Sequence, residues 1–102
     1  MSSTQERADR RREDDEAAAR DARVQQESAR LEGVVAAGLM RVLGRPADFL
    51  RTTTRLLWGS CYRVNVFVGP HVASARIAHS FFVEADSDGK ILTCRPPLTK
   101  AY

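Results

Sequence analysis

The sequence has few cysteines and no long hydrophobic run. Of its 102 residues only Cys61 and Cys94 are cysteines, too few for a disulfide framework. The opening residues lack the apolar segment of a secretory signal peptide. The nearly uncharged run at residues 33 to 40 is far shorter than the roughly twenty residues that span a bilayer, and no other run approaches that length. These absences predict a cytoplasmic protein with reduced thiols and no membrane partner.

The first third of the chain has no aromatic residue. Before Gly33 its only apolar side chains other than alanine are those of Met1, Val24 and Leu31, so this part cannot bury a core of its own. We therefore divide the chain into a charged helical arm, residues 1 to 32, and a small domain, residues 33 to 102.

The arm has helix-forming composition throughout. No proline occurs before Pro46 and alanine is frequent, which predicts a helix that continues to about Gly44. Ala17, Val24 and Leu31 recur at a spacing of seven, the pattern of a weak coiled-coil seam. The basic run Arg10 to Arg12 is followed at once by four acids, which neutralise its field.

The domain changes from helical to alternating periodicity, which predicts an α+β fold with a long N-terminal helix, a short second helix and a three-stranded antiparallel meander, the helices packed on one face. The β-branched residues Thr52 to Thr54 leave a strand as the alternative for residues 52 to 58. The predicted elements are an amphipathic helix over 33 to 43, a helix over 46 to 57, and strands over 61 to 68, 76 to 86 and 91 to 95.

The turn at Asp88-Gly89 sets the pairing of the last two strands. A tight hairpin here places Val83 opposite Cys94 and Ala85 opposite Leu92. One face of the second strand then carries Ile77, His79, Phe81, Val83 and Ala85. The other face of the sheet holds Phe67, Phe82 and Ile91, more hydrophobic surface than a solvent face needs.

No arrangement of reactive residues predicts catalysis. Glu84, Asp86 and Asp88 begin a calcium-loop pattern, but its twelfth position is Arg95 instead of a carboxylate. The possible soft metal ligands lack the close pairing of structural zinc sites; they are Cys61, His71, His79 and Cys94. We expect no catalytic residues, no metal and no cofactor, and therefore a protein that is not an enzyme.

The net charge of +3 is unevenly distributed. Residues 1 to 33 carry seven arginines against nine acids, whereas the rest of the chain carries nine basic residues against four acids. A basic domain suits a polyanion, and the arginines that would contact nucleic acid are Arg41, Arg45, Arg51, Arg55 and Arg63. Nearby aromatics, Trp58, Tyr62, Phe67 and Phe82, suit base stacking, although their alternation with valines favours core packing.

A domain of about seventy residues is near the lower limit of independent stability, so association with a partner is expected. We favour a homo-oligomer, with a dimer first, acting as a non-catalytic assembly protein, a scaffold or adaptor. Its interface residues would be Val24, Leu31, Val35, Phe67, Phe82 and Ile91. The alternatives are a nucleic-acid-binding accessory protein, binding to another protein, and a small-ligand sensor with a pocket between helix and sheet.

Overall fold

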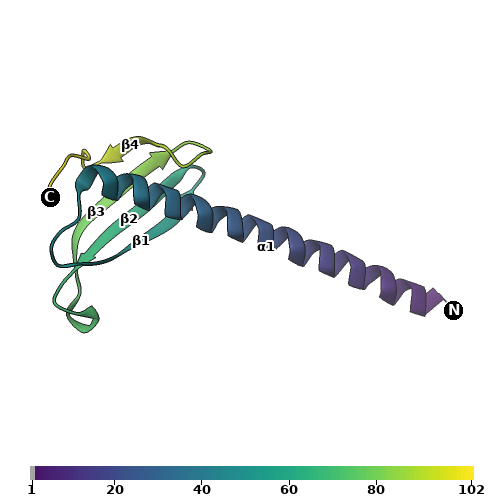
Figure 1. Cartoon of the computed structure of the whole chain (residues 1–102). Coiled ribbons are helices and arrows are strands. Elements are labelled where there is room, and N and C mark those ends of the chain that lie inside the picture. Colours follow the sequence, from purple (N-terminus) through teal and green to yellow (C-terminus); the bar gives the residue numbers. More distant parts are fainter. Residues whose placement is uncertain (1) are drawn as a thin grey trace.

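The fold is one long helix and a four-stranded antiparallel sheet (Figure 1). The structure is a computed structural model that describes the backbone of residues 2 to 102 and the side chains of residues 15 to 102. The α+β class predicted from the sequence is confirmed. The elements in chain order are α1 (Ser2–Leu43), β1 (Phe49–Trp58), β2 (Cys61–Val68), the short 3-10 helix η1 (Val72–Ser74), β3 (Arg76–Ala85) and β4 (Ile91–Arg95).

The predicted second helix over residues 46 to 57 is wrong, because this segment is strand β1. The sheet consequently has four strands, in the order β1-β2-β3-β4, where three were predicted. The β-branched run Thr52 to Thr54 pairs directly with β2, with Thr53 opposite Asn65. β-Branched side chains fit a pleated sheet better than a helix, so the alternative left open for residues 52 to 58 is the correct one.

Helix α1 runs without interruption through the predicted boundary at residues 32 and 33 and ends at Leu43. Gly44 adopts a positive φ of 86°, and a Cβ there would lie 2.5 Å from the carbonyl oxygen of Tyr102. The chain's last residues return to this point: the backbone N–H groups of Ala101 and Tyr102 donate to the carbonyl of Leu43 at 2.9 and 3.1 Å. The C-terminal tail thus caps the Leu43 carbonyl at the end of the helix.

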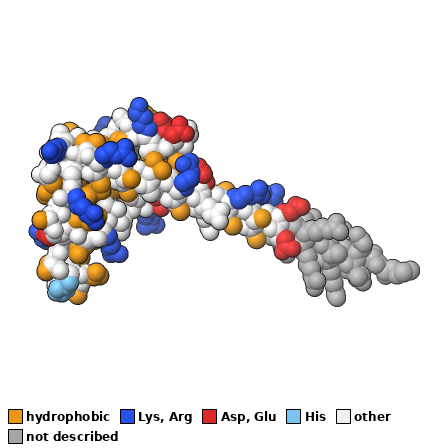
Figure 2. Space-filling model, in the orientation of Figure 1, with side chains coloured by type: hydrophobic (Ala, Val, Ile, Leu, Met, Phe, Trp, Pro, Cys, Tyr) orange, Lys and Arg blue, Asp and Glu red, His pale blue; other side chains and the backbone are white. Residues whose placement is uncertain are grey.

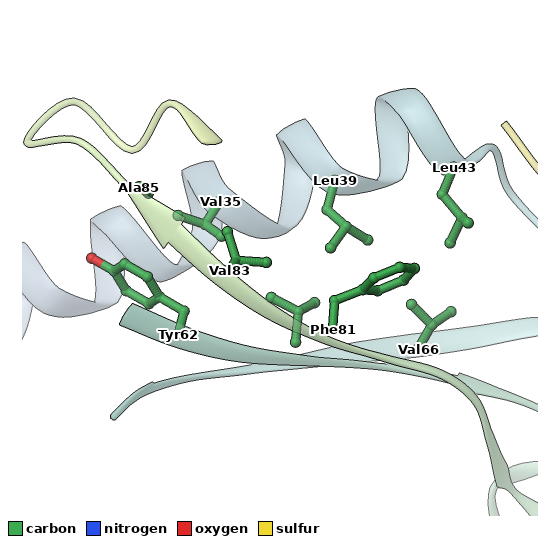
Figure 3. Packing of buried hydrophobic residues seen from close by; sticks show 9 residues of the cluster. Val35, Leu39, Leu43, Tyr62, Val66, Phe81, Val83 and Ala85 are labelled. Carbon is green, nitrogen blue, oxygen red and sulfur yellow. The ribbon is translucent and has the colours of Figure 1, made fainter. Parts of the chain in front are cut away.

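The core lies between α1 and one face of the sheet. Three side chains one helical turn apart, Val35, Leu39 and Leu43, point from α1 onto the strands and are buried (Figure 3). They pack against Tyr62, Val64, Val66, Phe81, Val83 and Ala85. The backbone N–H of Leu56 on edge strand β1 also donates to Glu32 Oε1 at 3.3 Å, which ties β1 to the helix. We call the face of the sheet that packs against α1 the covered face.

The observed register differs from the predicted one at two bulges. Val83 pairs with Cys94 as predicted, but the shift after Glu84 pairs Ala85 with Ile91 instead of Leu92. Ile91 therefore lies on the covered face, where it packs against the core. The predicted position of Ile91 on the opposite face is wrong, because a bulge of one residue reverses the side of every residue beyond it.

The second bulge lies between β2 and β3 at Ala78. It pairs Val66 with His79 but Phe67 with Ile77. Ile77 is consequently on the face opposite Phe81 and Val83, not beside them as predicted. Strand β3 ends at Ala85, one residue before the predicted limit.

The N-terminal part of α1 extends away from the domain (Figure 1). Between Asp15 and Arg30 every side chain is exposed except that of Ser28, which is half-buried. The radius of gyration is 19.6 Å and the longest dimension 69 Å, against about 13 Å for the radius of gyration of a compact chain of this length. The segment of α1 from Asp15 to Arg30 thus packs little against the described domain.

Candidate interaction surface on the open sheet face

Within residues 2 to 102, no helix covers the second face of the sheet, which we call the open face. The side chains that alternate with the buried ones lie here; on β2 these are Cys61, Arg63, Asn65 and Phe67. Cross-strand partners share a face, so the register assigns the rest. The open face also carries Arg51, Thr53 and Arg55 of β1, Ile77, Ser80, Phe82 and Glu84 of β3, and Thr93 and Arg95 of β4.

One line of directly paired residues crosses all four strands. Arg55 pairs with Arg63, Arg63 with Phe82, and Phe82 with Arg95. We call these four residues the arginine row. All three arginines are exposed. Like charges directly opposite one another on adjacent strands are unfavourable, so the Arg55–Arg63 pair costs stability.

Among the side chains from residue 15 onward, no acid forms an ion pair with an arginine of the row. The two ion pairs found there, Arg30 with Glu27 and Arg76 with Asp48, lie elsewhere. Glu84 is the one acid on the four strands. Arg63 Nη1 instead donates to Ser80 Oγ at 3.4 Å, and the Ser80 hydroxyl donates to Asn65 Oδ1 at 2.6 Å. The guanidinium groups of the row keep most of their donors free for an external anion.

Aromatic rings lie within and beside the arginine row. The Trp58 and Phe82 ring centroids are 5.6 Å apart, and Trp58 is 63% exposed. The Arg63 guanidinium lies over the Phe82 ring at 6.0 Å from its centroid. Arg51 lies over Phe67 in the same way at 4.9 Å. Such cation–π contacts hold arginine side chains near the ring without neutralising them.

The six residues predicted to form an interface do not lie on one common surface. Val24 is 66% exposed on the arm, whereas Val35 is fully buried in the core of its own chain. Leu31 and Ile91 are partly buried against that core. Phe67 and Phe82 lie on the open face, as the register above requires.

The predicted nucleic-acid arginines also separate into two groups. Arg51, Arg55 and Arg63 lie together on the open face. Arg41 is exposed on α1, and Arg45 lies over the Phe49 ring at 4.5 Å just beyond the helix. Arg95 was not among the predicted residues, although the correct pairing of Val83 with Cys94 implies that Arg95 lies opposite Phe82.

A groove runs along the other side of the molecule, beside α1. It has a volume of 510 Å³ and lies between α1, the turn before β4, and the C-terminal tail. Val34, Gly38 and Val42 form its helical wall, and Ile91 and Leu98 face them. Arg41, Asp88 and Lys90 supply its charged groups. Figure 2 shows this side of the molecule, with hydrophobic and basic side chains intermixed.

In the domain, the acid Asp86 and the thiol Cys94 occupy structural positions. Asp86 Oδ1 accepts hydrogen bonds from the backbone N–H groups of Asp88 and Lys90, both at 2.9 Å, and so shapes the turn. Burial raises the pKa of the Cys94 thiol, which makes it a poorer nucleophile. His79 Nε2 lies 2.7 Å from Tyr102 Oη. Across residues 15 to 102 no three His, Cys, Asp or Glu side chains gather as they would around a metal ion.

The chain matches no family model, no curated protein and no solved structure at a significant level. Over the described residues, no helix is both long enough and apolar enough to cross a membrane.

Proposed function

We propose that the protein is a non-catalytic binding protein whose open face binds single-stranded nucleic acid. The observation that carries the proposal is the arginine row, Arg55–Arg63–Phe82–Arg95, which spans four strands and forms no ion pair with an acid among residues 15 to 102. A bound phosphate would relieve the repulsion between Arg55 and Arg63, because it places negative charge between two adjacent guanidinium groups.

The aromatic residues beside the row favour a single strand over a duplex. Single-strand binding surfaces combine a basic track for the backbone with rings on which bases stack. Trp58 is largely exposed beside Phe82, so one face of this pair is available to a base. In a duplex the base faces are already stacked and cannot use such rings.

The charge of the open face also disfavours the pairing of two copies through it. A symmetric contact would bring together two arginine rows, with only Glu84 from each copy in compensation. Like charges brought into a dry interface cost several kcal/mol. The open face, which holds Phe67 and Phe82 of the predicted homo-oligomer interface, is accordingly better suited to an anionic ligand than to a second copy.

The test is a fluorescence-anisotropy titration with a labelled oligothymidylate of about 20 nucleotides. If the three row arginines contact phosphates, affinity should fall roughly 20-fold between about 50 and about 200 mM salt. The double variant Arg55→Gln, Arg63→Gln should bind much more weakly at low salt, and its affinity should fall only roughly threefold over the same range.

The matched control removes the same charge elsewhere. Arg45→Gln with Lys100→Gln changes two basic residues near the end of α1 and in the C-terminal tail, away from the open face. This control should retain both the affinity and the salt dependence of the natural protein. Equal weakening in both double variants, or no binding at low salt, would refute the proposal.

A second candidate function is homo-oligomeric assembly, as a scaffold or adaptor, with a dimer as the favoured state. The exposed part of α1 supports it: isolated helices gain little stability in water without a packed face, and Val24 is 66% exposed. Comparing the solution mass of the full chain with that of a chain starting at Glu32 tests it, since only the full chain should self-associate.

We also propose a cytoplasmic location. Cys61 and Cys94 are free thiols, and such thiols persist in reducing compartments. Labelling of both cysteines in the protein taken directly from cells would support this proposal, whereas quantitative oxidation would contradict it.

A further inference from the structure

A narrow stripe of residues spaced by seven runs along α1 from the exposed arm into the groove, with Asp21 and Ser28 beside it. Val24, Leu31 and Gly38 are spaced seven residues apart, so they lie on nearly the same side of the helix. Val24 is 66% exposed, and Val34 and Val42 on the groove wall are 38% and 46% exposed. A helix presents such a stripe to a partner helix.

Gly38 leaves the floor of the groove open. A Cβ built at Gly38 would meet only Ile91 Cδ1, at an ordinary contact distance of 3.8 Å. Packing within the chain therefore does not require glycine here, although glycine in a helix interior costs about 1 kcal/mol relative to alanine. Because Gly38 has no side chain, it leaves a hollow on the stripe that can accept a side chain from another helix.

We infer that the groove receives the arm of a second copy of this chain, in an antiparallel pairing of the two α1 helices centred on Leu31. In this arrangement the residue seven positions before Leu31 on one chain meets the residue seven positions after Leu31 on the other. Val24 of the partner thus fills the hollow at Gly38. Because the pairing is two-fold symmetric, this contact occurs twice.

Charge supports the same register. Ten positions from the centre, Asp21 of the partner meets Arg41, which lines the groove. Lys90 is a second cation of the groove, and Asp88 is its one acid. A parallel pairing would instead place Arg41 beside Arg41 and the hollow of Gly38 beside its own copy. The antiparallel arrangement therefore matches opposite charges and fills the hollow, whereas the parallel one does neither.

This pairing rests on the second candidate function and specifies its contacts. Sedimentation equilibrium of the full chain at about 100 μM should give a dimer. Asp21→Arg and Arg41→Asp should each weaken dimerisation by at least about tenfold, since each change creates two like-charge contacts. The combined variant Asp21→Arg, Arg41→Asp restores opposite charges and should recover the dimer.

The hollow is tested by a pair of leucine substitutions. Gly38→Leu fills the groove and should also weaken the dimer, whereas Gly33→Leu adds the same side chain where no atom lies within 4 Å and should leave it intact. Circular dichroism checks that each variant folds. A monomeric natural chain would overturn both self-association and the pairing. A dimer that is indifferent to the charge reversals or to Gly38→Leu would overturn the pairing alone.

Discussion

The two faces of the sheet are built from the same strands but have opposite surroundings. On β2, Tyr62, Val64 and Val66 are at most 3% exposed beneath α1, while Arg63 and Asn65 alternate with them on the open face, where Arg63 is exposed and Asn65 half-buried. Burial of the first set stabilises the fold. The second set includes a like-charge contact with β1 that opposes stability. The comparison indicates that one face determines the fold and the other is available for binding.

The largest expected difference between the faces is at two adjacent residues of β3. Phe81→Glu buries a carboxylate in the core with no partner, and the domain should unfold. Phe82→Glu puts the same group on the open face, so the protein should remain folded but lose oligothymidylate binding. Circular dichroism and thermal melting measure the first effect. A folded Phe81→Glu protein would show that the covered face contributes no more to the stability of the fold than the open face does.

A smaller effect is expected from shortening one core side chain. Leu39 is fully buried between the helix and the sheet. Leu39→Ala should lower the free energy of unfolding by about 2–5 kcal/mol, because it removes apolar contacts and leaves a cavity. The midpoint of urea denaturation measures this. A loss below about 1 kcal/mol would mean that α1 does not hold the covered face as described.

The sequence predicted those parts of the fold whose periodicity is unambiguous. The spans 61 to 68 and 91 to 95 coincide with β2 and β4, and the buried stripe of α1 follows from the spacing of Val35, Leu39 and Leu43. Strand β1 was mistaken for a helix because Pro46 and Asp48 resemble a helix start, and because its apolar residues also fit a helical period. In this segment packing against β2 decides between two locally acceptable structures.

The open face was only partly predictable. Alternation places Phe67 and Phe82 on one side, and the hairpin pairing could have added Arg95. Bulges carry no comparable signal in a single sequence, which is why Ile77 and Ile91 were assigned to the wrong faces. The alignment of Arg55 with Arg63 depended on recognising β1 as a strand.

One substitution on the open face should make the protein more stable while it removes binding. Arg55→Glu replaces the like-charge pair with Arg63 by an opposite-charge pair. The free energy of unfolding should therefore increase by about 0.2–1 kcal/mol, while nucleic-acid binding is lost. Denaturation at low salt measures the gain. A destabilised Arg55→Glu protein would contradict the unfavourable pairing inferred for the row.

The smallest effect concerns a titration on the covered face. Burial, and secondarily the charge of Glu32, raises the pKa of Tyr62 above its ordinary value of 10.0. The folded state thus holds this proton more tightly than the unfolded state does. The resulting stability is present below pH 10 and is lost as pH rises from there through the raised pKa. Tyr62→Phe should lose less stability than the natural protein between about pH 9 and about pH 11, by urea denaturation.

The most direct test of the central claim is to map oligothymidylate binding on the ¹⁵N-labelled protein by NMR. We expect chemical-shift changes at Arg55, Arg63, Phe82 and Arg95. We expect little change at Val35 and Leu39, which lie on α1 against the covered face. Changes confined to α1 and the groove, or no changes at low salt, would contradict the assignment of binding to the open face.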